Sequence, residues 1–154
     1  MTAGIALRFL HLTAVVVFLG DILVTAVWKW FADRSREPRV IAWAQRQVML
    51  TDRYLLIPSV AVLVVSGYAS ARLLGIAVWT TPTYAAAQVL FILSGLVWSR
   101  VLRPVQLRQL ALAEGIGPDQ AVPPEYFALA RRWLGWGLVA LALPFGSLFL
   151  MVYH

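Results

Sequence analysis

The chain has 154 residues, of which 61% are hydrophobic and 13% are charged, and its formal net charge is +6. Soluble domains carry about 25% charged and about 45–50% apolar residues, so this apolar excess excludes a water-soluble globular domain and requires lipid as the solvent. The sequence contains no cysteine and two histidines, which excludes disulfides, iron–sulfur clusters and a multi-histidine metal centre within one chain.

Four apolar runs reach the ~20 residues that a helix needs to cross a bilayer core of about 30 Å. They are residues 5–28, 54–74, 84–101 and 133–153. Helices are expected because a helix satisfies every backbone polar group where water is absent, and the alternating polar positions of a membrane barrel are missing. The first run exceeds the ~7–15 residues of a secretory signal, so we expect it to remain as a helix. The sequence predicts an all-α membrane bundle of four helices in a single domain, residues 1–154.

The connections between the runs differ in charge. The first and third connections, with their flanks, carry most of the lysine and arginine residues, whereas the short link at 75–83 carries no charge. Because lysine and arginine are retained on the cytoplasmic side, both basic connections are predicted to face inward and both termini outward, in a bacterial inner membrane. The positive charge then lies beside anionic lipid headgroups, which argues against a nucleic-acid-binding domain.

Both basic connections are expected to be partly helical and amphipathic. Pro38 stands shortly after Ser35, which is typical of a helix start, and apolar residues then recur at near-helical spacing. Residues 126–132 are expected to continue into the fourth run. Asp52, at the start of the second run, is interpreted as a helix N-cap. A proline inside the second run and another inside the fourth predict kinks.

Ionisable side chains inside a membrane span are costly and usually face the bundle interior. The first run carries two of them, His11 and Asp21. A rise of ~1.5 Å per residue places His11 roughly 9 Å below the outer surface and Asp21 roughly 12 Å from the inner surface. At the level of His11 the other runs offer residues 66–68, Gln88 and Ser147, so a polar layer is predicted in the outer third of the bundle.

Arg8 and Arg72 depart from the positive-inside pattern because both lie near the outer surface. Arg8 precedes His11 by three residues and therefore shares its helix face. With Gln88 and Tyr68 at the same level, these residues would suit haem b, with histidine as the axial iron ligand and the arginines holding the propionates. The alternative is that the arginines reach to the headgroups and His11 bonds a neighbouring serine or glutamine.

The sequence offers no convincing second axial ligand. His154 and Met151 approach the same outer side but lie shallower than His11, so a bound haem would be five-coordinate or shared across a homodimer. For copper, the soft ligands available are Met1, Met49 and Met151, which lie at opposite ends of the bundle.

Asp21 begins a polar stripe toward the inner side. Thr25 and Lys29 follow it at intervals of one helical turn. One interpretation is a proton or cation step. The other is a buried carboxyl group bonded to a neighbouring side chain, namely Ser59, Ser94 or Trp98.

Short motifs in a characteristic order run along nearly the whole chain: Phe9-Leu10-His11, Leu19-Gly20-Asp21, Ala26-Val27-Trp28-Lys29, Leu50-Thr51-Asp52, Pro58, Ser66-Gly67, Glu125-Tyr126, Arg132-Trp133 and Met151-Val152. In this order and spacing the sequence resembles the bacterial integral membrane proteins of the domain of unknown function family 2269. The resemblance implies a small inner-membrane protein of four helices without a settled activity.

The pair Leu10-His11, followed nine residues later by Gly20, is also remotely similar to two broader groups. These are the copper resistance D membrane proteins and the haem-containing bacterial protoporphyrinogen oxidases, in which a first-helix histidine is associated with haem. That resemblance implies a haem-handling or redox role for His11 alone. Two alternatives stay open: permeation of an ion or small solute through the bundle, and an accessory subunit whose small-residue faces bind a larger membrane complex.

Overall fold

The computed structural model describes residues 2–117 and 120–153, and eight helical segments account for most of them. The segments are α1 (Thr2–Ser35), α2 (Pro38–Thr51), η1 (Asp52–Leu56), α3 (Ile57–Leu73), α4 (Pro82–Val97), η2 (Trp98–Leu102), α5 (Arg103–Glu114) and α6 (Pro124–Tyr153). No strand occurs in these residues. Four continuous helices result, each long and apolar enough to cross a membrane: Ala3–Ser35, Pro38–Leu73, Pro82–Glu114 and Pro124–Tyr153. The predicted all-α fold with four spans is confirmed.

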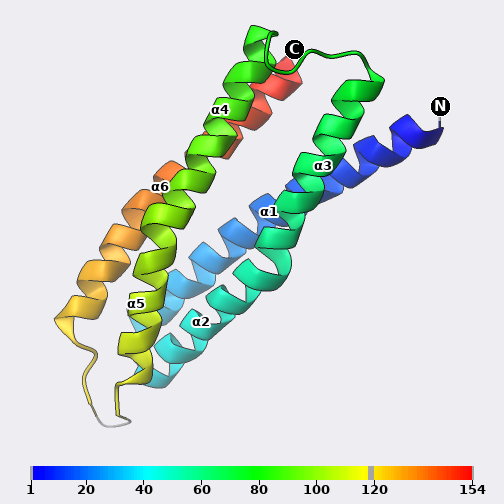
Figure 1. Ribbon diagram of the computed structural model, residues 1–154. Coiled ribbons are helices and arrows are strands. Elements are labelled where there is room, and N and C mark those ends of the chain that lie inside the picture. Colours follow the sequence, from blue (N-terminus) through cyan, green and yellow to red (C-terminus); the bar gives the residue numbers. More distant parts are fainter. Residues whose placement is uncertain (1, 118–119, 154) are drawn as a thin grey trace.

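The two ends of the bundle differ (Figure 1). Both termini and the α3–α4 link lie at one end, which we call the terminal end. The α1–α2 and α5–α6 connections lie at the other, the basic end. The turn between α1 and α2 is short because Arg36 adopts a left-handed backbone conformation with φ of 57°, and Pro38 then opens α2 in its first turn.

The helices pack as two pairs that are joined at the basic end. α1 lies along α3 and α4 lies along α6, while α2 packs against both α1 and α5. Within the described part of the chain, α3 makes no backbone contact with α4 or with α6. The bundle is therefore closed at the basic end, and its two helix pairs separate toward the terminal end (Figure 1).

Two π-helical turns, η1 and η2, interrupt the second and third spans, and each ends two residues before a proline. In η1 the N–H of Ile57 donates to the carbonyl of Asp52, and Pro58 follows. In η2 the N–H of Arg103 donates to the carbonyl of Trp98, and Pro104 follows. Proline has no N–H, and its ring clashes with the carbonyl four residues earlier. A wider π turn just before the proline relieves that clash, and such turns are frequent at functional sites.

The interpretation of Asp52 as a helix N-cap is wrong. The backbone stays helical from α2 into η1, with φ of −54° and ψ of −42° at Asp52. Because no helix begins there, no unpaired N–H groups are available for the side chain to cap. The Asp52 side chain points inward instead, and the residue is only 4% exposed.

Candidate functional site

A cavity of about 220 Å³ lies between the four spans. Most of its wall is apolar and includes Phe18 of α1, Val60 of α3, Phe91 of α4 and Leu141 of α6. Ile57 and Leu138 also line it, although they are 46% and 60% exposed on the lipid-facing surface. The cavity therefore reaches the side of the bundle that faces acyl chains.

Polar side chains gather at the end of the cavity nearest the basic end. Asp52 of η1, Trp98 of η2, Gln106 of α5 and Trp133 of α6 line it there, and we call these four residues the cavity floor. Asp52 and Gln106 are only 4% and 3% exposed. The two π turns place Asp52 and Trp98 in this floor, near each other but with the indole nitrogen and Oδ2 of Asp52 outside hydrogen-bonding geometry with any partner in the described chain.

The cavity floor contains four buried polar atoms that have no hydrogen-bond partner within the described chain. They are Oδ2 of Asp52, Oε1 of Gln106 and the indole Nε1 atoms of Trp98 and Trp133. A buried polar atom left unpaired costs about 1–3 kcal/mol, so native proteins pair nearly all of them. The floor thus presents two acceptor oxygens and two indole N–H donors toward the cavity.

Asp21 lies beside the floor and is 8% exposed. Its carboxyl group interacts with the Thr51 side chain, and it lies close enough to Asp52 for the two carboxyl groups to interact electrostatically. The expected bonds from Asp21 to Ser59 or Ser94 are wrong. Ser59 donates to the carbonyl of Leu56 at 2.8 Å and Ser94 to that of Ala140 at 2.7 Å. Serine in an apolar helix satisfies its hydroxyl on a nearby backbone carbonyl, which leaves no donor for the carboxyl group.

Thr25 and Trp98 do not bond the Asp21 side chain either. The Thr25 hydroxyl donates to the backbone carbonyl of Asp21 at 2.7 Å, so it satisfies itself within α1. The indole nitrogen of Trp98 has no partner. The polar stripe expected from Asp21 toward the inner side is therefore interrupted at Thr25.

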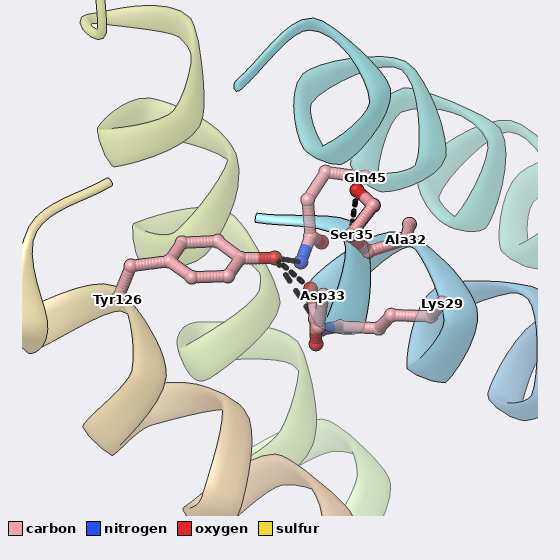
Figure 2. Close-up of polar contacts among 6 residues, drawn as sticks. All are labelled: Lys29, Ala32, Asp33, Ser35, Gln45 and Tyr126. Atoms are coloured by element: carbon pink, nitrogen blue, oxygen red, sulfur yellow. Dashed lines mark hydrogen bonds and ion pairs between the residues drawn. The ribbon is translucent and has the colours of Figure 1, made fainter. Parts of the chain in front are cut away.

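A second buried polar cluster lies at the basic end and is formed by Lys29, Asp33, Gln45 and Tyr126 (Figure 2). We call it the basic-end network. Nζ of Lys29 lies 2.6 Å from Oδ2 of Asp33. The Tyr126 hydroxyl donates to Oδ1 of Asp33 at 2.6 Å and accepts from Nε2 of Gln45 at 2.8 Å. One phenol thus joins three helices, α1, α2 and α6.

Lys29 is only 1% exposed, although the sequence placed it among the charges of a cytoplasmic connection. Its ammonium group lies 5.5 Å from the ring centroid of Tyr126 and 5.0 Å from that of Trp133. The ion pair with Asp33 and these two aromatic faces replace the water that a lysine normally keeps. The side chain is therefore a structural part of the closed basic end.

At the terminal end, His11 packs between α1 and α3. Nδ1 lies 3.0 Å from the carbonyl oxygen of Leu63 and 3.3 Å from Oγ of Ser66. Because a carbonyl can only accept, Nδ1 carries a proton and donates it, and Nε2 is the ring nitrogen left without a bond in the described chain. Gly67 makes this contact close, since a Cβ atom at that position would lie 3.0 Å from Cε1 of His11.

Among the described residues, no hydrogen bond joins His11 to Arg8, Arg72, Gln88 or Tyr68. Arg8 and Arg72 are exposed, as expected of long side chains that keep their charge in water. The Tyr68 hydroxyl donates to Oε1 of Gln88 at 3.4 Å, which links α3 to α4. Met1 and His154 lie outside the described residues. Within residues 2–117 and 120–153, no group of three or more histidine, aspartate or glutamate side chains could hold a metal ion.

The protein-family model described as "Predicted integral membrane protein (DUF2269)" matches residues 5–154. The chain belongs to this family. No curated protein and no solved structure matches the chain. The match confirms the resemblance in the short motifs, and a membrane protein with four spans agrees with the family description. That description names no activity.

Sequence reasoning missed the glutamines of this DUF2269 protein. Gln45, Gln106 and Gln109 are at most 3% exposed. The sequence pattern could have predicted the burial of Gln45, because this residue shares a helix face with the apolar residues Ile41 and Val48, at spacings of four and three. A polar residue on the apolar face of an amphipathic helix marks a buried polar contact. The sequence alone could not identify its partner, because Tyr126 lies 81 residues further along the chain.

The basic-end network predicts that Tyr126→Phe destabilises the protein. The change removes the hydroxyl that pairs with both Asp33 and Gln45, and leaving such groups unpaired costs about 1–3 kcal/mol. We expect a lower thermal unfolding midpoint for the purified protein in detergent. Tyr54→Phe is the matched control, because Tyr54 is 65% exposed. Equal midpoints for the two variants would contradict a stabilising role of the phenol.

Proposed function

We propose that this DUF2269 protein binds a lipid-soluble amphipathic molecule in the cavity between its spans. The polar head of that molecule would bond the cavity floor, and its apolar body would lie along the walls. One observation carries the proposal: four buried polar atoms without partners stand at one end of an otherwise apolar cavity. Such a combination of apolar walls and a few convergent polar groups is typical of small-molecule sites.

The physical chemistry favours a ligand that arrives from the bilayer. Ile57, Leu134 and Leu138 line the cavity and are also exposed toward lipid, so an apolar molecule can enter sideways. Each Å² of apolar surface removed from water is worth about 25 cal/mol, but a molecule already in lipid gains little of this. Affinity would therefore come from hydrogen bonds to Asp52, Gln106 and the two indoles. Permeation of a hydrated ion is disfavoured by the apolar walls on the terminal side.

Filling the cavity should displace the ligand. Gly137 lines the cavity, and a Cβ atom there would meet no atom within 4 Å. Gly137→Leu should therefore fold and occupy the site, reducing the co-purified ligand by roughly tenfold or more, the equivalent of ~1.4 kcal/mol. The measurement is native mass spectrometry of the protein extracted from its own membranes in mild detergent.

Gly135→Leu is the matched control for this experiment. Gly135 lies on the same helix with equally open space around its Cβ position, but it does not line the cavity. This variant should retain the bound molecule as the unmodified protein does. If no small molecule accompanies the unmodified protein, or if Gly137→Leu retains it fully, the proposed function is wrong.

A second proposal, haem b binding at His11, is supported by the hydrogen bond from Nδ1 to the Leu63 carbonyl. Histidines that ligate metals almost always donate their other ring nitrogen to a carbonyl, carboxylate or water. Nε2 of His11 would be the axial ligand, and the haem would serve a redox or haem-handling role.

The His11 proposal predicts a Soret absorption band when haem is added to the purified protein. His11→Ala should abolish the band because it removes the axial ligand. Ser66→Ala should keep it, since the Leu63 carbonyl still orients the ring. Absence of a Soret band, or a band that His11→Ala leaves unchanged, would reject haem ligation by His11.

We also propose that the protein lies in the bacterial inner membrane with its basic end in the cytoplasm and both termini outside. The support is the concentration of lysine and arginine in the two connections at the basic end. Because the chain has no cysteine, single-cysteine variants report this directly. Thr80→Cys, in the α3–α4 link, should react with a membrane-impermeant maleimide in spheroplasts. Gln120→Cys, in the α5–α6 connection, should react only after permeabilisation; the reverse pattern would invert the topology.

A further inference from the structure

We infer that the molecule bound in the cavity is a lipid whose head carries a protonated amine beside an oxygen acceptor, as in an amino alcohol. The inference rests on the proposed function and deepens it, because it names the head group that the cavity floor would select. The charge of the floor and its hydrogen-bonding capacity lead independently to this head group.

Asp52 gives the cavity its charge. Among the described residues that line the cavity, it is the one ionisable side chain, and no lysine or arginine lines the wall. The residue is only 4% exposed, so bulk water does not compensate its carboxylate. A buried carboxylate needs a cation or several donors against it, because taking a charge out of water is costly.

The charged groups around Asp52 do not supply that cation. Asp21 of α1 repels its carboxylate and Arg103 of α5 attracts it, so the two effects oppose each other, and neither residue lines the cavity. The Arg103 guanidinium lies over the ring of Trp98, with Cζ 5.6 Å from the ring centroid. The buried ammonium group of Lys29 is paired within the basic-end network. A cation inside the cavity would therefore complete the charge balance of the floor.

The unpartnered atoms of the floor define what else the head must offer. Oδ2 of Asp52 and Oε1 of Gln106 accept hydrogen bonds, whereas Nε1 of Trp98 and of Trp133 donate them. A protonated primary amine has three N–H donors, which suffice for the two oxygens. An oxygen atom beside the amine would accept from the indoles. A head with both groups could thus pair all four atoms.

Other head groups match the floor less well. A carboxylate or phosphate would place a second negative charge beside Asp52, and like charges repel strongly in a low-dielectric interior. A neutral alcohol would leave the carboxylate without a counter-charge. A metal cation would pair with the oxygens but would leave both indole N–H groups without an acceptor. The part of the chain that the structure describes also has no group of three or more acidic or histidine side chains to hold such an ion.

Three lipids with the same tail separate the charge of the head from its other properties. The probes are 2-aminododecan-1-ol, which is cationic at neutral pH, dodecane-1,2-diol, which is neutral, and 2-hydroxydodecanoic acid, which is anionic. Each is titrated into the full chain in phosphatidylcholine nanodiscs, and the bound fraction is read by native mass spectrometry. The amino alcohol should bind about tenfold or more tightly than the diol, because charge-assisted hydrogen bonds are roughly twice as strong as neutral ones. The hydroxy acid should bind most weakly. Equal binding of the amino alcohol and the diol would overturn the inference.

Asp52→Asn assigns the preference to the carboxylate. Asparagine has nearly the same shape but no charge, so the affinity for the amino alcohol should fall by about tenfold, while that for the diol stays the same. Glu37→Gln is the matched control, since it removes one negative charge from an exposed side chain that does not line the cavity. This variant should keep the preference. A preference that persists in Asp52→Asn would contradict the inference; if that variant does not assemble, the three probes on the unmodified protein still decide.

The outcome is separable from that of the proposed function. If the diol and the amino alcohol bind equally and Gly137→Leu loses both, the cavity is a ligand site without preference for an amine. If the amino alcohol binds more tightly and Gly137→Leu loses it, both conclusions hold. If none of the three probes binds, the inference fails, and the co-purified molecule alone decides the proposed function.

Discussion

The hydroxyl group of Tyr126 joins α1, α2 and α6 at the basic end of the bundle, and the arrangement of the four spans depends on this contact. A bilayer offers no water to a buried polar group, so each such group must find its partner inside the protein. Tyr126 meets this requirement for Asp33 and Gln45 at once, and Asp33 in turn neutralises Lys29. Because these residues come from α1, α2 and α6, their pairing closes the basic end. The two helix pairs can then separate toward the terminal end without loss of the fold.

That asymmetry produces the cavity. The π turns η1 and η2 lie where the closed part meets the open part, and each relieves the clash that the following proline would cause. Their wider turns direct Asp52 and Trp98 into the space between the spans. The same backbone feature therefore accommodates Pro58 and Pro104 and supplies polar groups to the cavity floor. The side chains that line the cavity nearer the terminal end are apolar, so the cavity has one polar end, the floor.

His11 and the cavity floor are separate features. His11 lies between α1 and α3 at the terminal end and is bonded to the Leu63 carbonyl. It is not among the residues that line the cavity. The polar layer predicted in the outer third of the bundle consists of separate contacts. Tyr68 bonds Gln88, whereas His11 bonds the Leu63 carbonyl and Ser66. The buried polar groups of this DUF2269 protein are instead concentrated toward the basic end.

The sequence by itself determined the fold class, the four spans and the burial of Asp21, because the cost of placing polar groups in lipid is set by composition and position along the chain. Only the tertiary structure decided which polar groups meet. The sequence predicted Asp52 as a helix N-cap, but the backbone is helical on both sides of it because α2 continues into the π turn η1. The sequence placed Lys29 just beyond the first span, but its ammonium group is buried against two aromatic rings of α6. The pairing of Gln45 with Tyr126 joins residues far apart in the chain. Periodicity within one helix reports which face is apolar, but it contains no information about the helix packed against that face.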